Sequence, residues 1–367
     1  MEKAYKYRIY PNKKQKELIQ KTFGCCRYVY NYFLDKRIET YREKKETLSY
    51  GTTSKMLTEL KKELIWLKEP DKDSLQKSLK DLDMAYQNFF KLHTGYPKFK
   101  SKKNRHQSYR TSCTNNNIKF LDKHIQLPKL GLVKIRDKQI PQGRMLNATI
   151  SQEPNGHYYC SICCTDVEMP QLAKTNKNIG IDLGLKDFAT FSDGIKIGNP
   201  RFYEKSEKKL AKLQRELSRK QIGSSNWNKA RIKVANLNKH IQNQRRDFLH
   251  KLTTDIIRAY DVIYIEDLDV SSMKETNSNV RNKHINDVSF YEFRRQLKYK
   301  SQWYGKILSV VDRYYPSSQI CHCCEYRDGK KDESVRVWTC PKCNTELDRD
   351  VNAAINILNE GLRLLSV

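Results

Sequence analysis

Apolar and polar side chains alternate at the start of the chain, and a helical period then replaces the alternation. Tyr5, Tyr7 and Ile9 fall on one face of residues 3 to 10, which is the spacing of a half-buried strand. From residue 13 to residue 92 apolar side chains recur every three or four positions, and this spacing predicts helices. The side chains with the helical spacing are Leu18, Ile19, Phe23, Cys26, Tyr30, Phe33, Leu34, Leu57, Leu60, Leu64, Leu75, Leu79, Leu82, Tyr86, Phe89 and Phe90.

The helical period stops at Gly95, and residues 95 to 110 are predicted to form a loop. Aromatic and basic side chains are interleaved along this loop: Tyr96, Lys98, Phe99, Lys100, Lys102, Lys103, Arg105, Tyr109 and Arg110. Aromatic rings can stack on nucleobases while cations bind phosphates. We therefore interpret the side chains from Tyr96 to Arg105 as nucleic-acid contacts, and a solvated connector is the alternative.

Short alternating runs return between residues 118 and 165 and predict strands of a small sheet or barrel. The runs are residues 118–125, 131–135, 147–150 and 158–164. Because one strand precedes the helices and the others follow them, the economical arrangement is one β-domain with a helical insertion. Cys160 and Cys163 have the spacing of metal ligands, but no second pair is nearby in the sequence, so we interpret them as apolar strand residues.

Residues 178 to 187, Asn-Ile-Gly-Ile-Asp-Leu-Gly-Leu-Lys-Asp, place a single carboxylate between two glycines of a predicted strand. Successive side chains of a strand point to opposite faces, so the apolar residues share the core face. Gly180, Asp182 and Gly184 share the other face. We expect open space above Asp182, sufficient for a metal ion or a nucleic-acid backbone, because the glycines have no side chains. For this segment alone, the alternative is an edge-strand aspartate beside turn glycines.

Two further apolar runs, residues 188–191 and 195–197, are joined by Ser-Asp-Gly, which predicts a β-hairpin. Residues 204–250 then combine helical spacing with many cations and a break at residues 223–226, and we expect a basic helical hairpin. The cations of its first run are Lys205, Lys208, Lys209, Lys212, Arg215 and Arg219. We interpret them, in particular Lys208, Lys212, Arg215 and Arg219, as phosphate contacts, with a solvated helix face as the alternative.

A nearly continuous apolar run from Val262 to Leu268 is typical of a buried strand, and a helical run that contains Leu249 and Ile256 precedes it. Glu266 lies at the carboxyl end of this strand, where open α/β sheets bind their ligands. The position favours Glu266 over Asp267 as a functional carboxylate. Asp267 can instead cap the turn that follows.

Asp348 and Asp350 open a predicted helix with an apolar face near the end of the chain. Helix capping explains one aspartate and fits Asp348, which leaves Asp350 for another role. Asp182, Glu266 and Asp350 are then three carboxylates from separate elements. Such a set can hold two Mg²⁺ ions about 3.5 to 4 Å apart, an arrangement that activates water for phosphodiester cleavage, and Mn²⁺ is the alternative ion.

Four cysteines have the spacing of a zinc site. Cys321 and Cys324 form one pair, Cys340 and Cys343 form a second, and fifteen residues separate the pairs. Four thiolates close a tetrahedral site and leave no position for water, so we expect a structural Zn²⁺. Cys323 is left over.

Composition narrows the class of partner. The 367 residues include 70 Lys and Arg against 42 Asp and Glu, which gives a formal charge of +28. Cations dispersed along the whole chain favour a nucleic acid over a lipid surface, because counterion release from a phosphate backbone rewards many contacts. The sequence has no long apolar run and no signal-peptide core at its start, so we expect a cytosolic protein without a membrane partner. In that compartment the eleven cysteines do not indicate a disulfide framework.

Together these motifs resemble the RuvC-type nuclease of transposon-encoded TnpB (OrfB) proteins, whose core type V CRISPR effectors share. The resemblance rests on Gly180-Ile181-Asp182-Leu183-Gly184, Ile265-Glu266-Asp267-Leu268, the cysteine ribbon and Asp348-Arg349-Asp350-Val351-Asn352-Ala353-Ala354. The opening Tyr-Arg-Ile-Tyr-Pro-Asn segment and Gln244 to His250 are also similar, so it covers nearly the whole chain. Ribbons of this family usually have glycine after each cysteine pair, where this chain has Glu325 and Asn344.

The resemblance implies a multidomain α+β protein. We expect an RNase H-like (RuvC) α/β nuclease domain at residues 176–316 and 345–367, with a zinc ribbon at 317–344. A small wedge-like β-barrel at residues 1–10 and 93–175 is expected, interrupted by a helical recognition domain at 11–92. Asp182, Glu266 and Asp350 would be the metal-binding triad.

The resemblance also implies an RNA-guided DNA endonuclease, with a guide RNA from the transposon end. Its target double-stranded DNA would be read by RNA pairing next to a short flanking motif. Two alternatives remain. A non-cutting regulator of transcription or transposition would use the same basic surfaces, although three intact carboxylates count against it. An unguided structure-specific nuclease would share the core chemistry but carry no discrete RNA.

Overall fold

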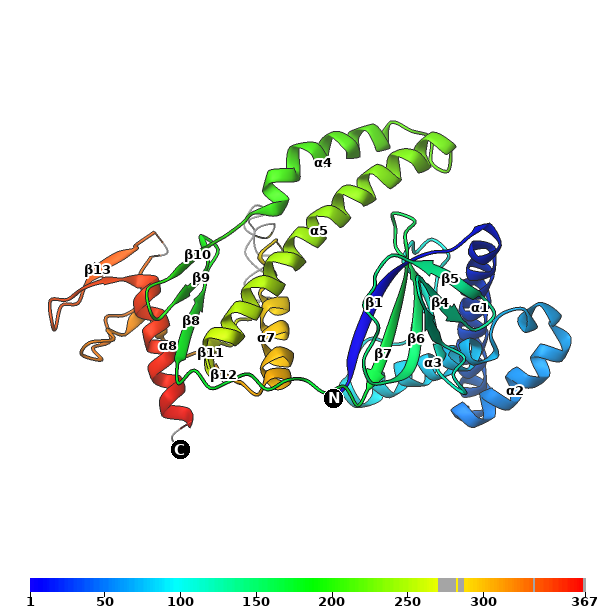
Figure 1. The fold of residues 1–367 in the computed structure, drawn as a ribbon, viewed down its shortest axis with the longest axis horizontal. Helices are drawn as coiled ribbons and strands as arrows, with labels where there is room; N and C mark the ends of the chain where they lie inside the picture. The colour runs from blue at the N-terminus through cyan, green and yellow to red at the C-terminus, as the bar shows by residue number, and fades with distance from the viewer. Residues whose placement is uncertain (270–281, 283–286, 333, 366–367) are drawn as a thin grey trace. The chain divides into compact units, whose positions relative to one another are not determined.

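Figure 1 shows the fold as a computed structural model, which describes residues 1–269, 282, 287–332 and 334–365. The chain divides into two compact units, Met1–Glu168 and Met169–Val367. Each unit is built on a large β-sheet of its own.

The first unit contains a seven-stranded antiparallel sheet. Its strands are β1 (Lys3–Tyr10), β2 (Gln107–Ser112), β3 (Lys119–Leu121), β4 (His124–Leu127), β5 (Gly131–Ile135), β6 (Arg144–Gln152) and β7 (Tyr158–Thr165), in the order β2-β6-β7-β1-β5-β4-β3. β1 therefore lies in the middle of the sheet, between β7 and β5. Tyr5, Tyr7 and Ile9 are buried on one face of β1, as their alternation predicts.

Three α-helices separate β1 from β2 in the sequence: α1 (Lys13–Lys44), α2 (Tyr50–Glu63) and α3 (Lys72–Leu92), with the 3₁₀-helix η1 (Ile65–Lys68) before α3. The start of α1 is fixed by a capping box. The Asn12 side chain accepts a hydrogen bond from the Gln15 N–H, and the Gln15 side chain accepts one from the Asn12 N–H. Phe23 of α1 packs on Tyr109 of β2, with ring centroids 5.8 Å apart, which places α1 against the sheet.

Two predictions for this unit are wrong in detail. The loop predicted over residues 95–110 ends at Gln107, where β2 begins, and Tyr109 is buried in that strand and is not free to stack on a nucleobase. The run of residues 118–125 forms two strands instead of one. Asp122 adopts a left-handed conformation, with φ 47°, and reverses the chain between β3 and β4.

The second unit contains a five-stranded mixed sheet. Its strands are β8 (Asn178–Leu183), β9 (Asp187–Phe191), β10 (Lys196–Gly198), β11 (Val262–Glu266) and β12 (Ile307–Val311), in the order β10-β9-β8-β11-β12. β8, β11 and β12 run parallel, while β9 is antiparallel to β8 and β10. β8 is the central strand, so the edge-strand interpretation of Asp182 is wrong.

Helices cover both faces of this sheet (Figure 1). One face packs against α5 (Ser225–Ala259) and α7 (Phe290–Tyr304), in a core that joins Ile179 and Ile181 to Phe293. The other face packs against α8 (Arg349–Leu365), where Tyr264 and Val311 meet Ile357. The sheet is therefore the middle layer of three. Ile179 and Ile181 are buried on the core face, as predicted.

A long helical hairpin extends from the second unit. Helix α4 (Phe202–Ser218) packs against the first half of α5 through Leu210, Leu237 and Ile241. Figure 1 shows the two helices side by side, with their connecting loop at the far end from the sheet. The helical run predicted around Leu249 and Ile256 is confirmed, and it is the second half of α5, which continues without a break from the hairpin.

A small ribbon lies between β12 and α8 in the sequence. It contains the 3₁₀-helix η3 (Ser317–Gln319) and a two-stranded antiparallel sheet of β13 (Val337–Thr339) and β14 (Glu346–Asp348). The core of the ribbon contains Cys321, Cys340, Trp338 and Leu347. With so small an apolar core, we expect the cysteines to supply much of its stability.

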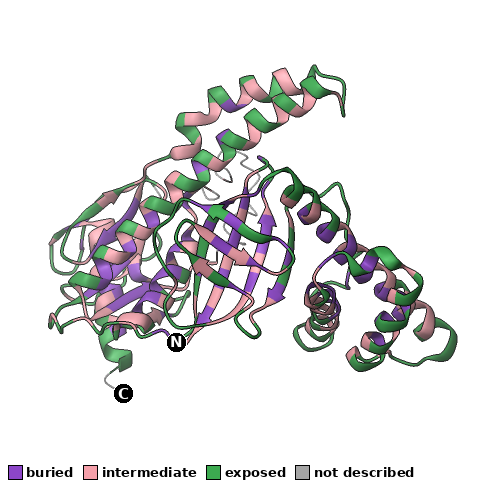
Figure 2. Ribbon diagram, turned by 45° about the vertical axis from the view of Figure 1, so that its right-hand side comes forward, coloured by how far each residue is buried: buried purple, intermediate pink, exposed green. Residues whose placement is uncertain are grey.

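Burial follows the layers, as Figure 2 shows: buried residues gather on the sheets and on the helix faces that cover them. The outer parts of α4 and α5 are mostly intermediate or exposed. No helix within the described residues is long and apolar enough to cross a membrane. The finer division into a barrel, a recognition domain and a nuclease domain stays a prediction.

Candidate metal centre and cysteine site

Asp182 and Glu266 come from neighbouring positions on two parallel strands. β8 and β11 pair in register up to Ile181 opposite Ile265, and each carboxylate follows directly after its member of this pair. Adjacent strands lie about 4.8 Å apart, and residues in register project to the same face. The two carboxylates therefore reach the same end of the sheet, at the carboxyl ends of its central strands.

Helix α8 packs unusually close to this face of the sheet. An added Cβ at Gly180 would lie 2.2 Å from the Ala354 carbonyl oxygen, and one at Gly361 would lie 2.0 Å from the Tyr264 ring. Glycine at these two positions lets the helix approach the strands. The cavity next to Asp182 agrees with the open space predicted above that residue, but the space does not extend to Gly180, where α8 fills it.

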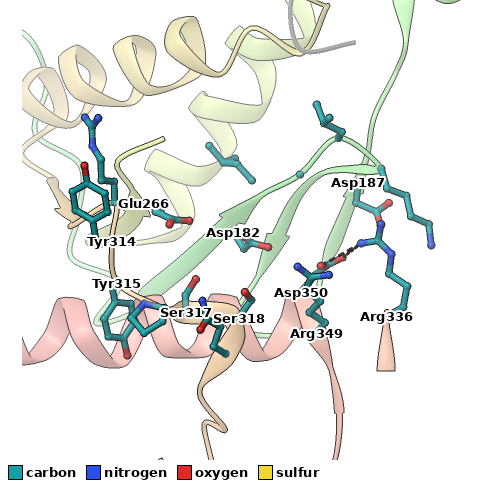
Figure 3. A pocket seen from close by; sticks show the side chains of 17 residues that line it. Asp182, Asp187, Glu266, Tyr314, Tyr315, Ser317, Ser318, Arg336, Arg349 and Asp350 are labelled. Carbon is teal, nitrogen blue, oxygen red and sulfur yellow. Dashed lines mark hydrogen bonds and ion pairs between the residues drawn. The ribbon is translucent and has the colours of Figure 1, made fainter. Parts of the chain in front are cut away.

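The first turn of α8 carries Asp350. The Asp348 carboxylate accepts hydrogen bonds from the N–H groups of Asp350, at 3.1 Å, and Val351, at 3.0 Å, so Asp348 caps the helix as predicted. Asp350 is left free of capping. Its carboxylate instead accepts a hydrogen bond from Arg336 at 3.2 Å, and Figure 3 shows it turned toward that guanidinium.

The three carboxylates line one cavity of about 500 Å³, which we call the acidic cavity. Figure 3 shows Asp182 between Glu266 on one side and Asp350 on the other. The remaining walls are residues 183–187, residues 313–319, Arg336 and Arg349. The structure thus brings together on one cavity three residues that lie far apart in the sequence.

Burial and mutual repulsion shape the electrostatics of the acidic cavity. Burial, with a contribution from the Asp350 charge, raises the pKa of Asp182 to about 7. Burial, with contributions from Asp182 and Asp267, raises the pKa of Glu266 to about 7. Both carboxyl groups hold protons more strongly than usual chiefly because burial removes water from their charged forms, and neighbouring carboxylates add to the effect. Such a site gains from a bound cation.

Asp267 is paired with arginines, unlike the neighbouring Glu266. Arg313 donates to its carboxylate at 2.7 Å and Arg294 forms a second ion pair with it. These contacts lower the pKa of Asp267 below its ordinary value. The charge of Asp267 is thus occupied by arginines, whereas Glu266 lines the acidic cavity. The contrast supports the sequence-based preference for Glu266.

Sequence reasoning missed the arginines that line the acidic cavity. Arg336 precedes β13, and Arg349 begins α8. Arg336 lies in none of the motifs, and Arg349 lies in the Asp348-to-Ala354 motif without a role of its own assigned to it. Only the folded arrangement, in which the ribbon returns its chain to the end of β8, reveals that they reach the carboxylates.

Four cysteine sulfurs form a compact group that we call the cysteine site. The Sγ atoms of Cys321 and Cys343 are 3.6 Å apart, and so are those of Cys324 and Cys340. A tetrahedral zinc site with Zn–S bonds of about 2.3 Å has sulfurs about 3.8 Å apart, so the four side chains fit Zn²⁺. Cys323 lies outside the group and contacts the His322 ring at 3.4 Å.

The cysteine site is the one group within the described residues whose His, Cys, Asp or Glu ligand atoms, three or more of them, all lie within 4.8 Å of one another. The three carboxylates share a cavity but are less closely gathered. The Arg336 contact holds Asp350 to one side of it. Coordination of a single ion by all three side chains therefore requires side-chain movement.

Both cysteine loops make the same turn. The Glu325 N–H donates to the Cys321 carbonyl at 2.9 Å, and the Asn344 N–H donates to the Cys340 carbonyl at 2.8 Å. Glu325 and Asn344 are left-handed, with φ of 60° and 54°. These are the positions at which the sequence departs from the expected glycine. The chain therefore builds the expected turns with residues for which this conformation is less favourable.

The loop residues predicted to contact nucleic acid are mostly accessible. Lys98, Lys102, Lys103 and Arg105 are exposed. Phe99 is 55% exposed and Tyr96 is 46% exposed. Lys100 is engaged within the protein, because its ammonium group lies 3.9 Å from the centroid of the Tyr30 ring. Tyr96 also hydrogen-bonds the Tyr86 hydroxyl at 3.0 Å, so the loop is held against α3.

The predicted phosphate contacts on the basic hairpin lie along α4 and just beyond its end. They are Lys208, Lys212, Arg215 and Arg219, and all are exposed. Their spacing of four, three and four residues places them on one side of a helix. The buried side chain of Leu210 faces α5 instead. The cations therefore form a stripe, which we call the α4 stripe.

Three family models match parts of this chain. A model described as "Probable transposase", of the OrfB_IS605 family, matches residues 161–277. A "Helix-turn-helix domain" model of the same family matches residues 1–46, and a "Cas12f1-like, TNB domain" model matches residues 290–357. In the structure, residues 1–46 contain the strand β1 and the single long helix α1.

Curated relatives extend over the whole chain. A Streptomyces pristinaespiralis protein named "Putative RNA-guided DNA endonuclease" is 39% identical over 99% of this chain and 90% of its own length. The Escherichia coli protein "Putative RNA-guided DNA endonuclease InsQ" is 35% identical over 99% and 93%. Mimivirus proteins named TnpB-like are 26% identical over 52% of this chain.

A solved structure shares the fold at low identity. The protein in "Cryo-EM structure of the Cas12f1-sgRNA-target DNA complex" aligns with a TM-score of 0.59 and 11% identity, over 98% of this chain and 99% of that one. Identity this low supports a common α+β multidomain fold and nothing finer. The full-length relatives above 30% identity settle the family: this chain belongs to the TnpB (OrfB) family of transposon-encoded proteins.

Proposed function

We propose that this protein is an RNA-guided DNA endonuclease with a RuvC-like, metal-dependent active site. The observation that carries the proposal is the acidic cavity, in which Asp182, Glu266 and Asp350 meet in a chain with a formal charge of +28. The names of its full-length relatives, which refer to RNA-guided DNA endonucleases, support the guidance. The guide would come from the transposon end, and the substrate would be double-stranded DNA beside a short motif.

The residues of the acidic cavity suit hard divalent cations. Asp182, Glu266 and Asp350 offer carboxylate oxygens, the ligands that Mg²⁺ and Mn²⁺ prefer. Two bound ions of this kind supply activation of water and stabilisation of the leaving oxygen in phosphodiester hydrolysis. The raised pKa values of Asp182 and Glu266 fit this role, because cations then replace protons on carboxyl groups that the protein leaves uncompensated.

Two arginines and one loop also line the acidic cavity beside the carboxylates. Arg336 pairs with Asp350 and would compete with a bound cation for that carboxylate. Arg336 and Arg349 also place guanidinium groups on the cavity wall, where they can pair with a phosphate. Residues 313–319 line another side of the cavity.

The cysteine site is proposed to hold a structural Zn²⁺. Its four sulfurs leave no open position, so it stabilises the ribbon and performs no chemistry. We further propose the domain division expected from the sequence: a RuvC-like domain at residues 176–316 and 345–367, a zinc ribbon at 317–344, and a wedge-like barrel at 1–10 and 93–175 around a helical recognition domain at 11–92.

The exposed loop cations and the α4 stripe are proposed to bind the phosphate backbone. Replacing Lys212 with Gln should weaken nucleic-acid binding uniformly across sequences. The slope of log affinity against log salt should fall by about 1 for each phosphate contact removed. Glu216→Gln on the same helix is the control and should not reduce affinity. An unchanged slope in Lys212→Gln removes that residue from the interface.

The decisive experiment uses the full chain purified with its copurifying RNA. The RNA is sequenced, and plasmids that contain the matching target beside a randomised flank are incubated with Mg²⁺. Cleavage beside a defined flank is expected, with loss of at least about 10²-fold when Asp182, Glu266 or Asp350 is replaced with Ala. Asp247→Ala is the control, because that carboxylate pairs with Lys251 on the exposed surface of α5.

Each alternative gives a different result. Target occupancy without strand breaks identifies a binding protein. Cutting by preparations that contain no discrete RNA identifies an unguided nuclease. Full activity in Asp182→Ala, Glu266→Ala or Asp350→Ala shows that the acidic cavity is not the active site.

A further inference from the structure

Helix α8 carries two buried asparagines whose side chains bind the backbone of the ribbon. Asn352 is 1% exposed and Asn356 is 3% exposed, and they lie one helical turn apart. Asparagine this deeply buried is uncommon unless its amide is satisfied by the protein. Both side-chain amides are hydrogen-bonded to backbone groups of the ribbon segment.

Asn352 binds the first cysteine loop. Its carbonyl oxygen accepts a hydrogen bond from the His322 N–H at 3.0 Å and lies 3.0 Å from the Nδ1 atom of the same residue. Its amide group donates to the Ile320 carbonyl at 2.7 Å. The two partners flank Cys321, which is fully buried in the cysteine site. The Asn352 side chain thus hydrogen-bonds the backbone on both sides of Cys321.

Asn356 binds the segment that leads into the same loop. Its amide donates to the Ser317 carbonyl at 2.8 Å and to the Ile320 carbonyl at 2.7 Å. Ser317 lines the acidic cavity, together with Tyr315, Pro316 and Ser318. Asn356 therefore fixes a wall of the acidic cavity to α8.

Helix α8 is held firmly on its other side. Gly180 and Gly361 allow contact so close that an added Cβ would clash, and Ile357 packs into the sheet core. Asp350 lies in the first turn of this helix, two residues before Asn352. The ribbon approaches Asp350 from its far end as well, because Arg336 pairs with Asp350, and the Arg349 N–H donates to the Arg336 carbonyl at 2.8 Å.

We propose that Asn352 and Asn356 are positioning residues that couple the cysteine site to the acidic cavity. Zn²⁺ at the cysteine site orders the loop around Cys321. Through their hydrogen bonds, Asn352 and Asn356 then restrain the first turn of α8 and the cavity wall at residues 315–318. The affinity of the carboxylates for a divalent cation then depends on whether zinc is bound. This inference rests on the metal sites of the proposed function and does not require that the protein cut DNA.

Linkage makes the coupling measurable in both directions. If zinc tightens cation binding by some factor, the cation tightens zinc binding by the same factor. Neither asparagine is a candidate ligand of either ion, since the carboxylates and the thiolates supply those atoms. The coupling therefore changes when an asparagine is replaced, while the ligands of both sites stay intact.

The test uses the full chain and Mn²⁺ as the probe. Binding of Mn²⁺ is measured by electron paramagnetic resonance, with zinc bound and after zinc is removed by a chelator, and the zinc content is measured at each stage. In the wild-type protein, zinc is expected to tighten Mn²⁺ binding about tenfold, within the range typical of coupled sites. In Asn352→Ala and Asn356→Ala the ratio of Mn²⁺ affinity with zinc to Mn²⁺ affinity without zinc should fall toward one. One zinc should still be bound per chain.

Controls separate the coupling from the metal sites themselves. Glu360→Gln changes an ion pair with the exposed Arg363 on the same helix and should leave the effect of zinc on Mn²⁺ affinity unchanged. Asp182→Ala should abolish the Mn²⁺ signal of the acidic cavity, which assigns the signal. A wild-type protein that binds no Mn²⁺ there refutes the proposed metal centre. Equal Mn²⁺ affinity with and without zinc overturns the coupling alone.

The wild-type comparison keeps the test decisive if an alanine variant does not fold. Asn352→Asp then serves as the second variant, because it keeps the acceptor for His322 and loses the donor to Ile320. It should retain zinc and show a reduced factor. If zinc still tightens Mn²⁺ binding about tenfold in every folded variant, the asparagines do not couple the two sites.

Discussion

Replacing Gly180 with Ala tests whether the packing of α8 on β8 sets the acidic cavity. The new Cβ would lie 2.2 Å from the Ala354 carbonyl oxygen, 2.7 Å from the Leu358 amide nitrogen and 2.9 Å from the Leu358 Cβ. Ordinary contacts between such atoms are about 3.5 Å, so the helix must retreat by about 1 Å. Two of the three atoms belong to backbone, which has no rotamer to relieve the clash.

The retreat of α8 is expected to lower both the stability and the cleavage rate. Overpacking of this kind costs about 1–3 kcal/mol of unfolding free energy, which lowers the urea midpoint. The same movement carries Asp350 away from Asp182, and a displacement of about 1 Å in a catalytic arrangement costs about 10²-fold in rate. We therefore expect Gly180→Ala to be folded, moderately destabilised and nearly inactive in plasmid cleavage.

Gly198→Ala is the matched control, because it places the same methyl group on β10 of the same sheet, where no atom lies within 4 Å. Its stability should stay within about 0.5 kcal/mol of the wild-type value. Wild-type stability and activity in Gly180→Ala would refute the close packing of α8. Lost stability with full activity would refute the link between helix position and the carboxylates.

Three further predictions concern charge and backbone conformation. Asp182→Asn should raise stability without divalent ions, since a folded pKa of about 7 against an ordinary value of 3.8 means that ionisation favours the unfolded chain; the gain in melting temperature should grow from pH 4 to pH 7 and then level off. A gain that shrinks as pH rises would contradict this. Arg336→Ala should tighten Mn²⁺ binding up to about fivefold, because it removes a partly exposed ion pair, worth at most about 1 kcal/mol, that competes for Asp350. Unchanged or weaker binding would show that Arg336 does not compete. Glu325→Gly should raise the stability of the zinc-loaded protein by about 1 kcal/mol by relieving a left-handed residue, whereas Glu346→Gly in β14 should not.

Local patterns predicted much of the fold and the residues that gather at the acidic cavity and the cysteine site. The alternation at Tyr5, Tyr7 and Ile9 and the run ending at Glu266 report strands, because each side chain's environment depends on its immediate neighbours. Cysteine spacing reports a compact site for the same reason. These signals need no knowledge of distant parts of the chain.

The errors came from contacts between distant segments. Nothing near Gly180 reveals that α8 will fill the space above it. Tyr109 lies among cations in the sequence, yet Phe23 of α1 covers it in the fold. Arg336 has no motif, and its contact with Asp350 depends on how the ribbon returns to the sheet. Such features are set by tertiary packing, which single-sequence periodicity does not report.

The placement of the three carboxylates on β8, β11 and α8 also has a consequence for folding. Strands β8 and β11 can pair before α8 docks, but Asp350 arrives only with that helix. Contacts between such remote segments form late and slowly, because the intervening chain must first be ordered. Partly folded molecules in which α8 has not docked therefore lack the third carboxylate of the acidic cavity, and under the proposed function such molecules would bind nucleic acid without cutting it.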